Sequence, residues 1–257
     1  MPIIQAVERA LKILDLFDET ETELKITDIS ERMQLHKSTV HSLLKTLQLH
    51  GYIDQNPENG RYRLGMKLFE RGNFVIHGLD IRKVAKRYLV DLSLQTGQTT
   101  HLVILDDKEG VYIDKVEGQL ATILYSRIGR RVPLHSSGAG KVLMAFLKEE
   151  EQQKILTGYR YVVHTPNTIT NEADFRKELA KVRQAGYSVD NQENEPGVRC
   201  IAVPILNHKG QVIAAISIST LVSRVDDEQL QQFLVLLQQA AAEISEQMGY
   251  GIAHQSS

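Results

Sequence analysis

Hydrogen-bond donors are concentrated in residues 32–53, a span that contains no aspartate or glutamate. Hydroxyl, imidazole and ammonium groups donate to phosphate oxygens and to the edges of nucleic-acid bases, whereas carboxylates repel phosphates. The candidate nucleic-acid contacts in this span are Lys37, Ser38, Thr39, His41, Ser42 and Lys45. A solvated helix face that lacks acidic residues by chance explains the same pattern. The neighbouring elements are therefore needed to choose between a nucleic-acid-binding surface and a solvated face.

These donors fall on the second of two short helices. A first helix is predicted over residues 28–33 with Thr27 as its N-cap, and residues 34–36 form a tight turn. A second helix is predicted over residues 37–49 because its apolar residues recur at helical spacing. Those apolar residues are Val40, Leu43, Leu44 and Leu47. The donors then occupy the exposed surface of the second helix, as in a helix–turn–helix that enters the major groove.

A hairpin is predicted directly after the second helix, over residues 52–64, with an Asn-Gly pair that favours positive φ at its turn. The returning strand carries Arg61 and Arg63, which suit a contact with the DNA backbone or the minor groove. Helices followed by such a wing indicate a DNA-binding domain more specifically than any single residue does. They predict a winged helix–turn–helix domain over residues 1–65.

Further helices are predicted before the helix–turn–helix and after the hairpin. Helical spacing of apolar residues predicts an amphipathic helix over residues 4–18 with one buried face. That face consists of Val7, Ala10, Leu11, Leu14 and Phe17. Residues 66–97 are predicted to be helical in two pieces that break near Gly78, and residues 66–79 form a linker to a second domain.

The remaining chain predicts an α+β domain over residues 80–250, followed by a tail over residues 251–257. Strands are predicted over residues 99–105, 111–117, 121–127, 187–191, 200–206 and 211–220. Helices are predicted over residues 137–147, 149–157, 171–185 and 226–248. Turn sequences between neighbouring strands close hairpins, so we expect an antiparallel sheet with helices packed against it.

Catalytic and metal chemistry are disfavoured. Residues 137–141 (SGAGK) suggest a phosphate-binding nucleotide loop, but His135 and Val142 replace the glycine and the hydroxyl residue that such a loop requires. Cys200 is the only cysteine, which excludes an internal disulfide and a multi-cysteine metal site, and it lies outside any recognised catalytic signature. The histidines lack the spacing of metal ligands. We therefore expect no catalytic residue, no metal and no cofactor.

Composition excludes several other protein classes. The 257-residue chain has 42% hydrophobic and 24% charged residues, which is ordinary for a soluble globular protein. No run of about 18 apolar residues predicts a membrane span, and the charged N-terminal helix is not a secretory signal. These features and the single cysteine favour the cytoplasm. With a net charge of −2, any affinity for nucleic acid must come from the local distribution of charge.

Small and hydroxylated residues suggest a ligand pocket in the second domain. Residues 136–141 are glycine-rich at the start of a predicted helix, where free N–H groups bind carboxylates or phosphates. Helix capping and close packing explain this segment equally well. Ser217 and Ser219 lie two apart in a predicted strand and therefore face the same side of the sheet. That side is either a polar pocket or the protein surface.

Three segments carry a resemblance to a known family. They are residues 6–65, which include HKSTVHSLLKTL and GYIDQNPENGRYRLG, residues 129–147 (GRRVPLHSSGAGKVLMAFL) and residues 194–205 (NEPGVRCIAVPI). In collinear order over almost the whole chain, they resemble the IclR family of bacterial transcription regulators. The resemblance implies a winged helix–turn–helix, a linker helix and a GAF-like effector-binding domain. It also implies that the N-terminal and linker helices help to build a dimer.

The resemblance further implies a set of effector-binding positions. They are Gly138 and Ala139 at the helix start, Asp190, Cys200, Ser217 and Ser219, with Leu124 as an apolar wall. Small organic acids are held between these regions in the family, so a small anionic metabolite is the expected ligand. Asp190 complicates this expectation, because a carboxylate repels an anion unless it is protonated or accepts from a ligand hydroxyl. Glu193 and Glu195 either strengthen that repulsion or face solvent.

The sequence therefore predicts a cytoplasmic DNA-binding transcriptional regulator that is controlled by a small organic acid. We expect a homodimer, or a dimer of dimers, on a pseudo-palindromic operator in double-stranded DNA. Repression is the expected output because repressors predominate among the proteins that the chain resembles. The alternatives are a metabolite-converting enzyme with a nucleic-acid-binding head and a purely architectural DNA-binding protein.

Overall fold

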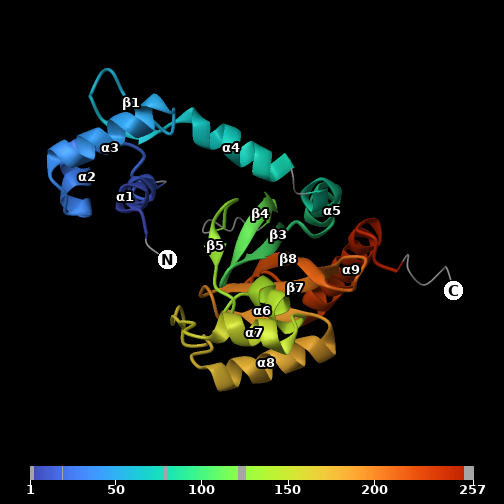
Figure 1. Ribbon diagram of the computed structural model, residues 1–257. Coiled ribbons are helices and arrows are strands. Elements are labelled where there is room, and N and C mark those ends of the chain that lie inside the picture. Colours follow the sequence, from blue (N-terminus) through green and yellow to red (C-terminus); the bar gives the residue numbers. More distant parts are fainter. Residues whose placement is uncertain (1–2, 19, 78–79, 121–125, 252–257) are drawn as a thin grey trace. The chain divides into compact units, whose positions relative to one another are not determined.

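The chain forms two compact units, Met1–Gly78 and Leu79–Ser257, and most of their helices and strands are labelled in Figure 1. The computed structural model describes residues 3–18, 20–77, 80–120 and 126–251 of the 257-residue chain. Among these residues, helices and a hairpin make up the first unit, and the second unit is built around a six-stranded sheet.

The first unit is a small helical domain with a hairpin. Its helices are α1 (Gln5–Leu14), α2 (Ile26–Met33), α3 (Lys37–Leu49) and α4 (Met66–His77), and its strands are β1 (Ile53–Gln55) and β2 (Tyr62–Leu64). The strands pair antiparallel, and Leu24 forms an additional bridge to Tyr62. The core is formed by Ile13, Phe17, Leu24, Ile29, Val40, Leu44, Ile53 and Tyr62. The predicted helix–turn–helix and wing are confirmed.

The start of α2 differs from the prediction. The helix begins at Ile26, and its N-cap is Lys25 rather than Thr27. The Asp28 carboxylate accepts a hydrogen bond from the Lys25 backbone N–H (N···Oδ2 3.2 Å). Asp28 therefore reaches back from the third position of the helix and fixes its start from within.

The N-terminal helix also differs from the prediction. α1 ends at Leu14 and buries Ile13, whereas Val7 and Leu11 of the predicted buried face are 54% and 57% exposed. A helix with apolar residues on more than one side can bury only the side that meets the core of its own unit. Val7 and Leu11 are thus left uncovered within the unit, whereas Phe17 at the far end of the predicted stripe joins the core.

The base of the wing packs tightly against the end of α3. Gly51 adopts a positive φ of 74° where the helix ends. Gly65 lies so close to it that a Cβ at Gly65 would overlap the Gly51 carbonyl oxygen. The Gly65 N–H also donates to the Tyr52 carbonyl (2.9 Å). These backbone contacts fix the direction in which the hairpin leaves α3, and so they place Arg61 and Arg63.

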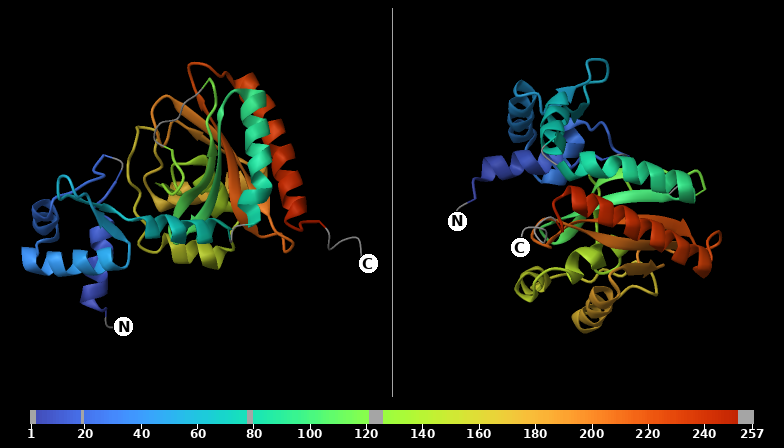
Figure 2. Two further views of the ribbon diagram at one scale, coloured as in Figure 1. Left: turned by 90° about the horizontal axis from the view of Figure 1, so that it is seen from above. Right: turned by 90° about the vertical axis from the view of Figure 1, so that its right-hand side faces the viewer.

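The second unit contains an antiparallel sheet in the order β5-β4-β3-β8-β7-β6. Its strands are β3 (Thr99–Asp106), β4 (Glu109–Val116), β5 (Arg131–Val132), β6 (Ser188–Asn191), β7 (Val198–Leu206) and β8 (Val212–Leu221). Its helices are α5 (Asp80–Thr96), α6 (Gly138–Ala145), α7 (Glu149–Leu156), α8 (Glu172–Ala185) and α9 (Asp227–Gln247). Figure 2 shows α5 and α9 side by side along one face, with α6 and α8 on the opposite side. The predicted α+β class is confirmed.

One predicted strand has no counterpart in the described residues. Of residues 121–127, residues 121–125 lie outside the described part of the chain and residues 126–127 are not in a strand. A short strand that was not predicted, β5, follows and pairs with β4. The other predicted strands, and the predicted helices of this unit, agree with the structure to within two residues at each end.

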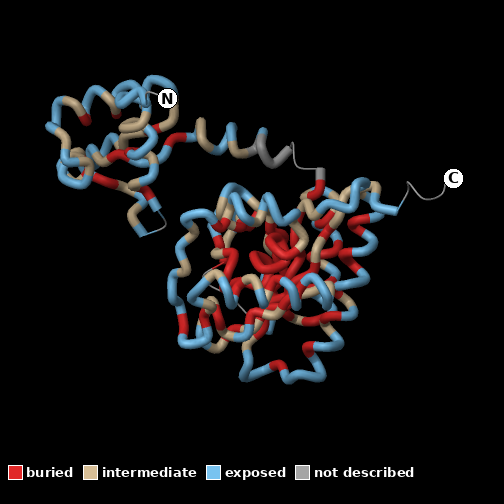
Figure 3. Tube along the Cα trace, turned by 60° about the horizontal axis from the view of Figure 1, so that its bottom comes forward, coloured by how far each residue is buried: buried red, intermediate tan, exposed pale blue. Residues whose placement is uncertain are grey.

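The two faces of the sheet differ in chemistry. Ile216 and Ile218 of β8 join a hydrophobic core with α5 and α9, whereas the alternate residues, including Ser217 and Ser219, face the side of α6. Figure 3 shows that buried residues fill the centre of this unit. Both serines are buried, at 4% and 3% exposure, so the alternative that they face the protein surface is wrong.

Candidate ligand site and nucleic-acid interface

The candidate nucleic-acid contacts lie together on the outer surface of α3. Val40 and Leu44 are fully buried and fix the orientation of the helix. The opposite surface carries exposed Lys37, Ser38, His41, Ser42 and Lys45, with Thr39 half-buried beside them. Among the described residues, neither Lys37 nor Lys45 forms an ion pair. Both ammonium groups are therefore available to phosphates.

The two wing arginines differ in their electrostatic surroundings. Arg63 pairs with Asp54 on the facing strand (Nη2–Oδ2 2.7 Å, Nε–Oδ2 3.1 Å), and this contact holds the pKa of Asp54 below its usual value. Arg61 has no carboxylate partner in the part of the chain that the structure describes. Both members of the Arg63–Asp54 pair are about half exposed, so a phosphate can replace the carboxylate at small cost.

Glu23 holds the loop of the wing, a role that sequence reasoning missed. Its carboxylate accepts hydrogen bonds from the side-chain amides of Asn56 (Nδ2···Oε1 3.0 Å) and Asn59 (Nδ2···Oε2 2.9 Å), and these bonds lower the pKa of Glu23. The nearer of these partners is 33 residues away in sequence. No local pattern could therefore have identified the contact.

Four of the predicted effector positions meet on the α6 face of the sheet. Cys200 in β7 lies opposite Asp190 in β6 and Ser219 in β8. Ser217 lies one row further along, opposite Ala202. Directly opposed residues of antiparallel strands point to the same side, so these side chains share one face. The four predicted residues are 1% to 6% exposed.

The first turn of α6 lies over β7. A Cβ built on Gly138 would lie 3.5 Å from the Cys200 carbonyl oxygen, which is ordinary contact distance. Ser137 caps the helix by accepting the Gly140 N–H (3.1 Å). Capping and close packing both occur, yet within the described residues the N–H groups of Gly138 and Ala139 have no acceptor. The start of α6 thus places these two N–H donors beside the buried polar side chains of Asp190, Cys200 and Ser219.

Asp190 is the most deeply buried carboxyl group of the site. Its Oδ1 accepts the backbone N–H groups of Glu193 (2.7 Å) and Asn194 (3.3 Å). Burial raises the pKa of Asp190 to about 7, and the charge of Glu193 acts in the same direction. The carboxyl group is therefore partly protonated at neutral pH. Partial protonation removes much of the repulsion that the sequence led us to expect toward an anion.

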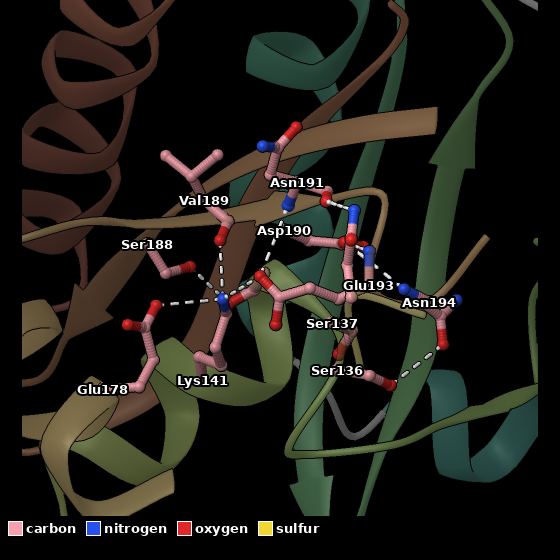
Figure 4. A network of polar contacts seen from close by, with 12 residues as sticks. Ser136, Ser137, Lys141, Glu178, Ser188, Val189, Asp190, Asn191, Glu193 and Asn194 are labelled. Atoms are coloured by element: carbon pink, nitrogen blue, oxygen red, sulfur yellow. Dashed lines mark hydrogen bonds and ion pairs between the residues drawn. The ribbon is translucent and has the colours of Figure 1, made fainter. Parts of the chain in front are cut away.

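Lys141 is fully buried and connects α6 to the segment that presents Asp190. Its Nζ contacts Glu193 Oε1 (2.7 Å), Glu178 Oε1 (3.0 Å) and the Val189 carbonyl (2.6 Å), as Figure 4 shows. The alternative that Glu193 faces solvent is wrong, because its side chain is buried against this ammonium group. The ion pair offsets part of the repulsion that its charge would exert on an anion. Sequence reasoning considered Lys141 only as part of a nucleotide loop.

Cys200 is placed for packing rather than for nucleophilic attack. Its Sγ lies 2.9 Å from Ser219 Oγ. Burial raises the pKa of the thiol, and the negative charge of Asp190 adds to this effect, so the sulfur stays protonated at neutral pH. His135, which is available as a base in the sequence, instead contacts the Tyr159 hydroxyl (Nδ1, 2.9 Å) and a backbone carbonyl.

The α6 face also holds His101, a residue that sequence reasoning missed. It lies in β3, opposite Ser217 on one side and Lys115 on the other. Its Nε2 lies 2.8 Å from Ser126 Oγ. Burial lowers the pKa of His101 to about 3, helped by the charge of Lys115, so the ring is neutral. The available signal was alternation, because His101 shares a face with Thr99 in a strand next to the two serines.

Three further expectations concern the edges of the site. Leu124, the predicted apolar wall, lies outside the described residues. Glu195 is half-buried rather than facing solvent freely, and burial raises the pKa of its carboxyl group. In the described ranges there is no group of three or more residues that could hold a metal ion.

Among the helices that the structure describes, none is long and apolar enough to cross a bilayer.

Comparisons with known proteins assign both units. Residues 6–57 match the family model described as IclR helix-turn-helix domain, and residues 73–246 match the one described as Bacterial transcriptional regulator IclR C-terminal. The chain is also 62% identical over 250 residues to the HTH-type transcriptional regulator XynR of Escherichia coli K12. That alignment covers 97% of this chain and 99% of XynR.

Solved structures agree with these matches. The crystal structure of Thermotoga maritima IclR has a TM-score of 0.79 and 37% identity, covering 96% of this chain and 99% of its own. An IclR homologue from Microbacterium hydrocarbonoxydans, complexed with 4-hydroxybenzoate, has a TM-score of 0.81 and 26% identity, covering 95% and 98%. The chain therefore belongs to the IclR family of DNA-binding helix–turn–helix transcriptional regulators.

Proposed function

We propose that this chain is a homodimeric repressor whose binding to a pseudo-palindromic operator is controlled by a small organic acid held beneath the first turn of α6. One observation carries the proposal. The start of α6, whose first N–H groups have no acceptor among the described residues, lies beside the buried polar side chains of Asp190, Cys200 and Ser219. Polar groups gathered inside a domain are costly unless a polar partner joins them. The 4-hydroxybenzoate bound by a homologue is itself an organic acid, which supports this class of ligand.

A carboxylate suits the start of α6 because Gly138 and Ala139 supply donors without an acceptor among the described residues, at the positive end of the helix dipole. Asp190 donates a hydrogen bond to the acid when protonated, and it accepts one from a ligand hydroxyl when ionised. Ser217 and Ser219 add hydroxyl groups that both donate and accept. The acid would thus be held by neutral or partly neutral partners rather than by a dedicated cation.

On DNA, α3 would enter the major groove. Ser38, Thr39, His41 and Ser42 would reach base edges, while Lys37, Lys45, Arg61 and Arg63 would contact phosphates. Few cations per copy imply modest affinity from one domain. Two domains on two half-sites raise the total affinity, because the second binding event becomes intramolecular.

Control by the acid requires that it bind with different affinity to the arrangements that do and do not fit the operator. Repression is the expected output because repressors predominate in the family. The protonated state of Cys200, together with the engagement of His135 elsewhere, speaks against the alternative of a metabolite-converting enzyme.

A charge reversal on α3 tests whether DNA and acid bind at separate sites. A DNA duplex is first selected from a random-sequence pool by its binding to the full-length protein. Fluorescence anisotropy then measures DNA binding, and thermal unfolding measures stabilisation by a panel of carboxylic acids. Lys45→Glu should lose most of the DNA affinity and keep the stabilisation. Lys154→Glu, at an exposed position of α7, changes the net charge equally and should keep both.

Each failure of this experiment has a distinct meaning. Loss of both properties in Lys45→Glu would contradict separate sites. A panel in which no acid stabilises the protein would contradict the organic-acid site. Chemical conversion of a bound acid, followed by chromatography, would favour the enzyme alternative.

A further inference from the structure

One ring nitrogen of His101 is unpaired within the part of the chain that the structure describes. The residue is 1% exposed, Nε2 lies 2.8 Å from Ser126 Oγ, and none of the described residues supplies a partner for Nδ1. His135 in the same unit is equally buried but uses both nitrogens, with the Tyr159 hydroxyl at 2.9 Å and the Val162 carbonyl at 3.0 Å. A buried polar atom without a partner costs free energy, so Nδ1 of His101 is suited to a partner from outside the protein.

Strand register places His101 in the proposed effector site. His101 lies opposite Ser217 in β8, and Ser217 lies opposite Ala202 in β7, so the three form a row across adjacent strands. Gly138 at the start of α6 lies directly over this part of β7, with its built Cβ 3.6 Å from Ala202 Cβ. Two strand spacings of about 4.8 Å put His101 roughly 10 Å across the sheet from the helix start.

That separation limits the length of a ligand that reaches both ends. A hydrogen bond at each end takes up about 2.8 Å, which leaves roughly 4–5 Å for the carbon skeleton. In an extended zigzag this corresponds to about three or four carbon–carbon bonds of about 1.5 Å. An acid of about four to six carbons would fit, with its carboxylate at α6 and its far end at His101.

The chemistry of the ring favours a hydroxyl group at the far end. A neutral imidazole carries its proton on either nitrogen, so Nδ1 of His101 is a donor in one tautomer and an acceptor in the other. A hydroxyl pairs with both forms, whereas a second carboxylate only accepts and gains no charge from a neutral ring. The positive charge of Lys115 is already engaged by Glu117 (3.1 Å) and by the Ser126 carbonyl (2.7 Å).

We propose that His101 determines the specificity of the effector site by hydrogen-bonding a hydroxyl group remote from the carboxylate of the effector. The protein then responds to hydroxylated straight-chain acids rather than to unsubstituted acids of the same length. This inference rests on the proposed organic-acid site and adds the class of acid and the residue that recognises it.

Two substitutions separate the roles of the ring nitrogens. His101→Asn keeps a polar atom near the position of Nδ1, whereas His101→Gln keeps one near Nε2 and so retains only the contact with Ser126. Thr100→Val is the matched control, because Thr100 is buried in the same strand but faces the other side, where its hydroxyl donates to the Leu89 carbonyl (2.9 Å). Thermal unfolding without ligand checks that each variant is folded.

Isothermal titration of the full-length protein compares the stereoisomers of the C4 to C6 aldonic acids with butanoate, pentanoate and hexanoate. The wild-type protein should bind at least one aldonic acid more tightly than the unsubstituted acid of equal length. His101→Gln should reduce this preference by about 3- to 10-fold, the effect of one lost hydrogen bond. His101→Asn and Thr100→Val should retain it.

An unchanged preference in His101→Gln would overturn the inference. The inference would also be overturned if the wild-type protein bound the unsubstituted acids, or glutarate and adipate, more tightly than the aldonic acids of equal length. Each of these results would leave the proposed organic-acid site intact. If no acid of any series binds, the organic-acid site fails and the inference fails with it.

Discussion

Replacing Lys141 with methionine should strongly destabilise the second unit. The side chain is 0% exposed, and the change deletes a charge that contacts Glu193, Glu178 and the Val189 carbonyl. Removing one partner of a buried ion pair costs about 3–5 kcal/mol, because the remaining charge is left without compensation. Glu178 is 25% exposed and can regain water, so we expect the lower end of this range, about 3 kcal/mol.

Differential scanning calorimetry of the full-length protein measures this loss. In a unit of this size, about 1 kcal/mol lowers Tm by about 2–4 °C, so the transition of the second unit should fall by about 6–12 °C. The first unit should keep its transition temperature. Lys177→Met is the matched control, because Lys177 also forms an ion pair, with Asp174 at 2.9 Å, but is 72% exposed. Its Tm should change by less than about 2 °C.

A fall of less than about 2 °C in Lys141→Met would refute the role of Lys141 as a buried tie between α6, α8 and the segment of Asp190. The double variant Lys141→Met/Glu193→Leu separates two causes of the loss. If the uncompensated charge of Glu193 is the origin, the double variant should be more stable than Lys141→Met alone. No recovery would show that the loss has another source.

Two further predictions concern pH and DNA contacts. Burial raises the pKa of Asp190 from 3.8 to about 7, so the folded protein keeps a proton that the unfolded chain releases between these values. The contribution of Asp190 to the free energy of unfolding therefore falls as pH rises from about 4 to about 7, and urea unfolding should show a flatter pH dependence in Asp190→Asn. An identical pH dependence in both proteins would contradict the raised pKa. Arg61→Ala should weaken operator binding more than Arg63→Ala, because Arg63 must first leave Asp54. In salt titrations, Arg61→Ala should reduce the slope of log Kd against log salt by about 1. Equal losses of affinity in Arg61→Ala and Arg63→Ala would contradict the argument that Arg61 is more readily available to a phosphate than Arg63.

Periodicity made much of the fold predictable. The helical spacing of Val40 and Leu44 identified the buried side of α3 and, with it, the surface that carries the candidate DNA contacts. The two-residue spacing of Ser217 and Ser219 placed both on one face of β8. The pattern could not say whether that face was covered, because its burial depends on α6, which lies far away in the sequence.

Contacts between segments that lie far apart in the sequence could not be predicted from local patterns. Lys141 is a lone cation in an apolar helix, and its partner Glu193 lies 52 residues away, so only the fold brings them together. His101 contacts Ser126, which lies 25 residues further along the chain. The sequence pattern of its strand did not distinguish His101 as a site residue. The same limit applies to the N-terminal helix predicted over residues 4–18, because its apolar stripe is visible in the sequence, but the sequence does not show that Phe17 is buried while Val7 and Leu11 stay exposed.

Coupling between the acid and the operator is the central claim, and a paired titration tests it most directly. The affinity of the full-length protein for a stabilising acid is measured with and without the selected operator, and its affinity for the operator is measured with and without the acid. Thermodynamic linkage requires the two ratios to be equal, and we predict a ratio of about 5 to 150 in both. A ratio of one in both titrations, with acid and DNA each bound, would contradict the claim.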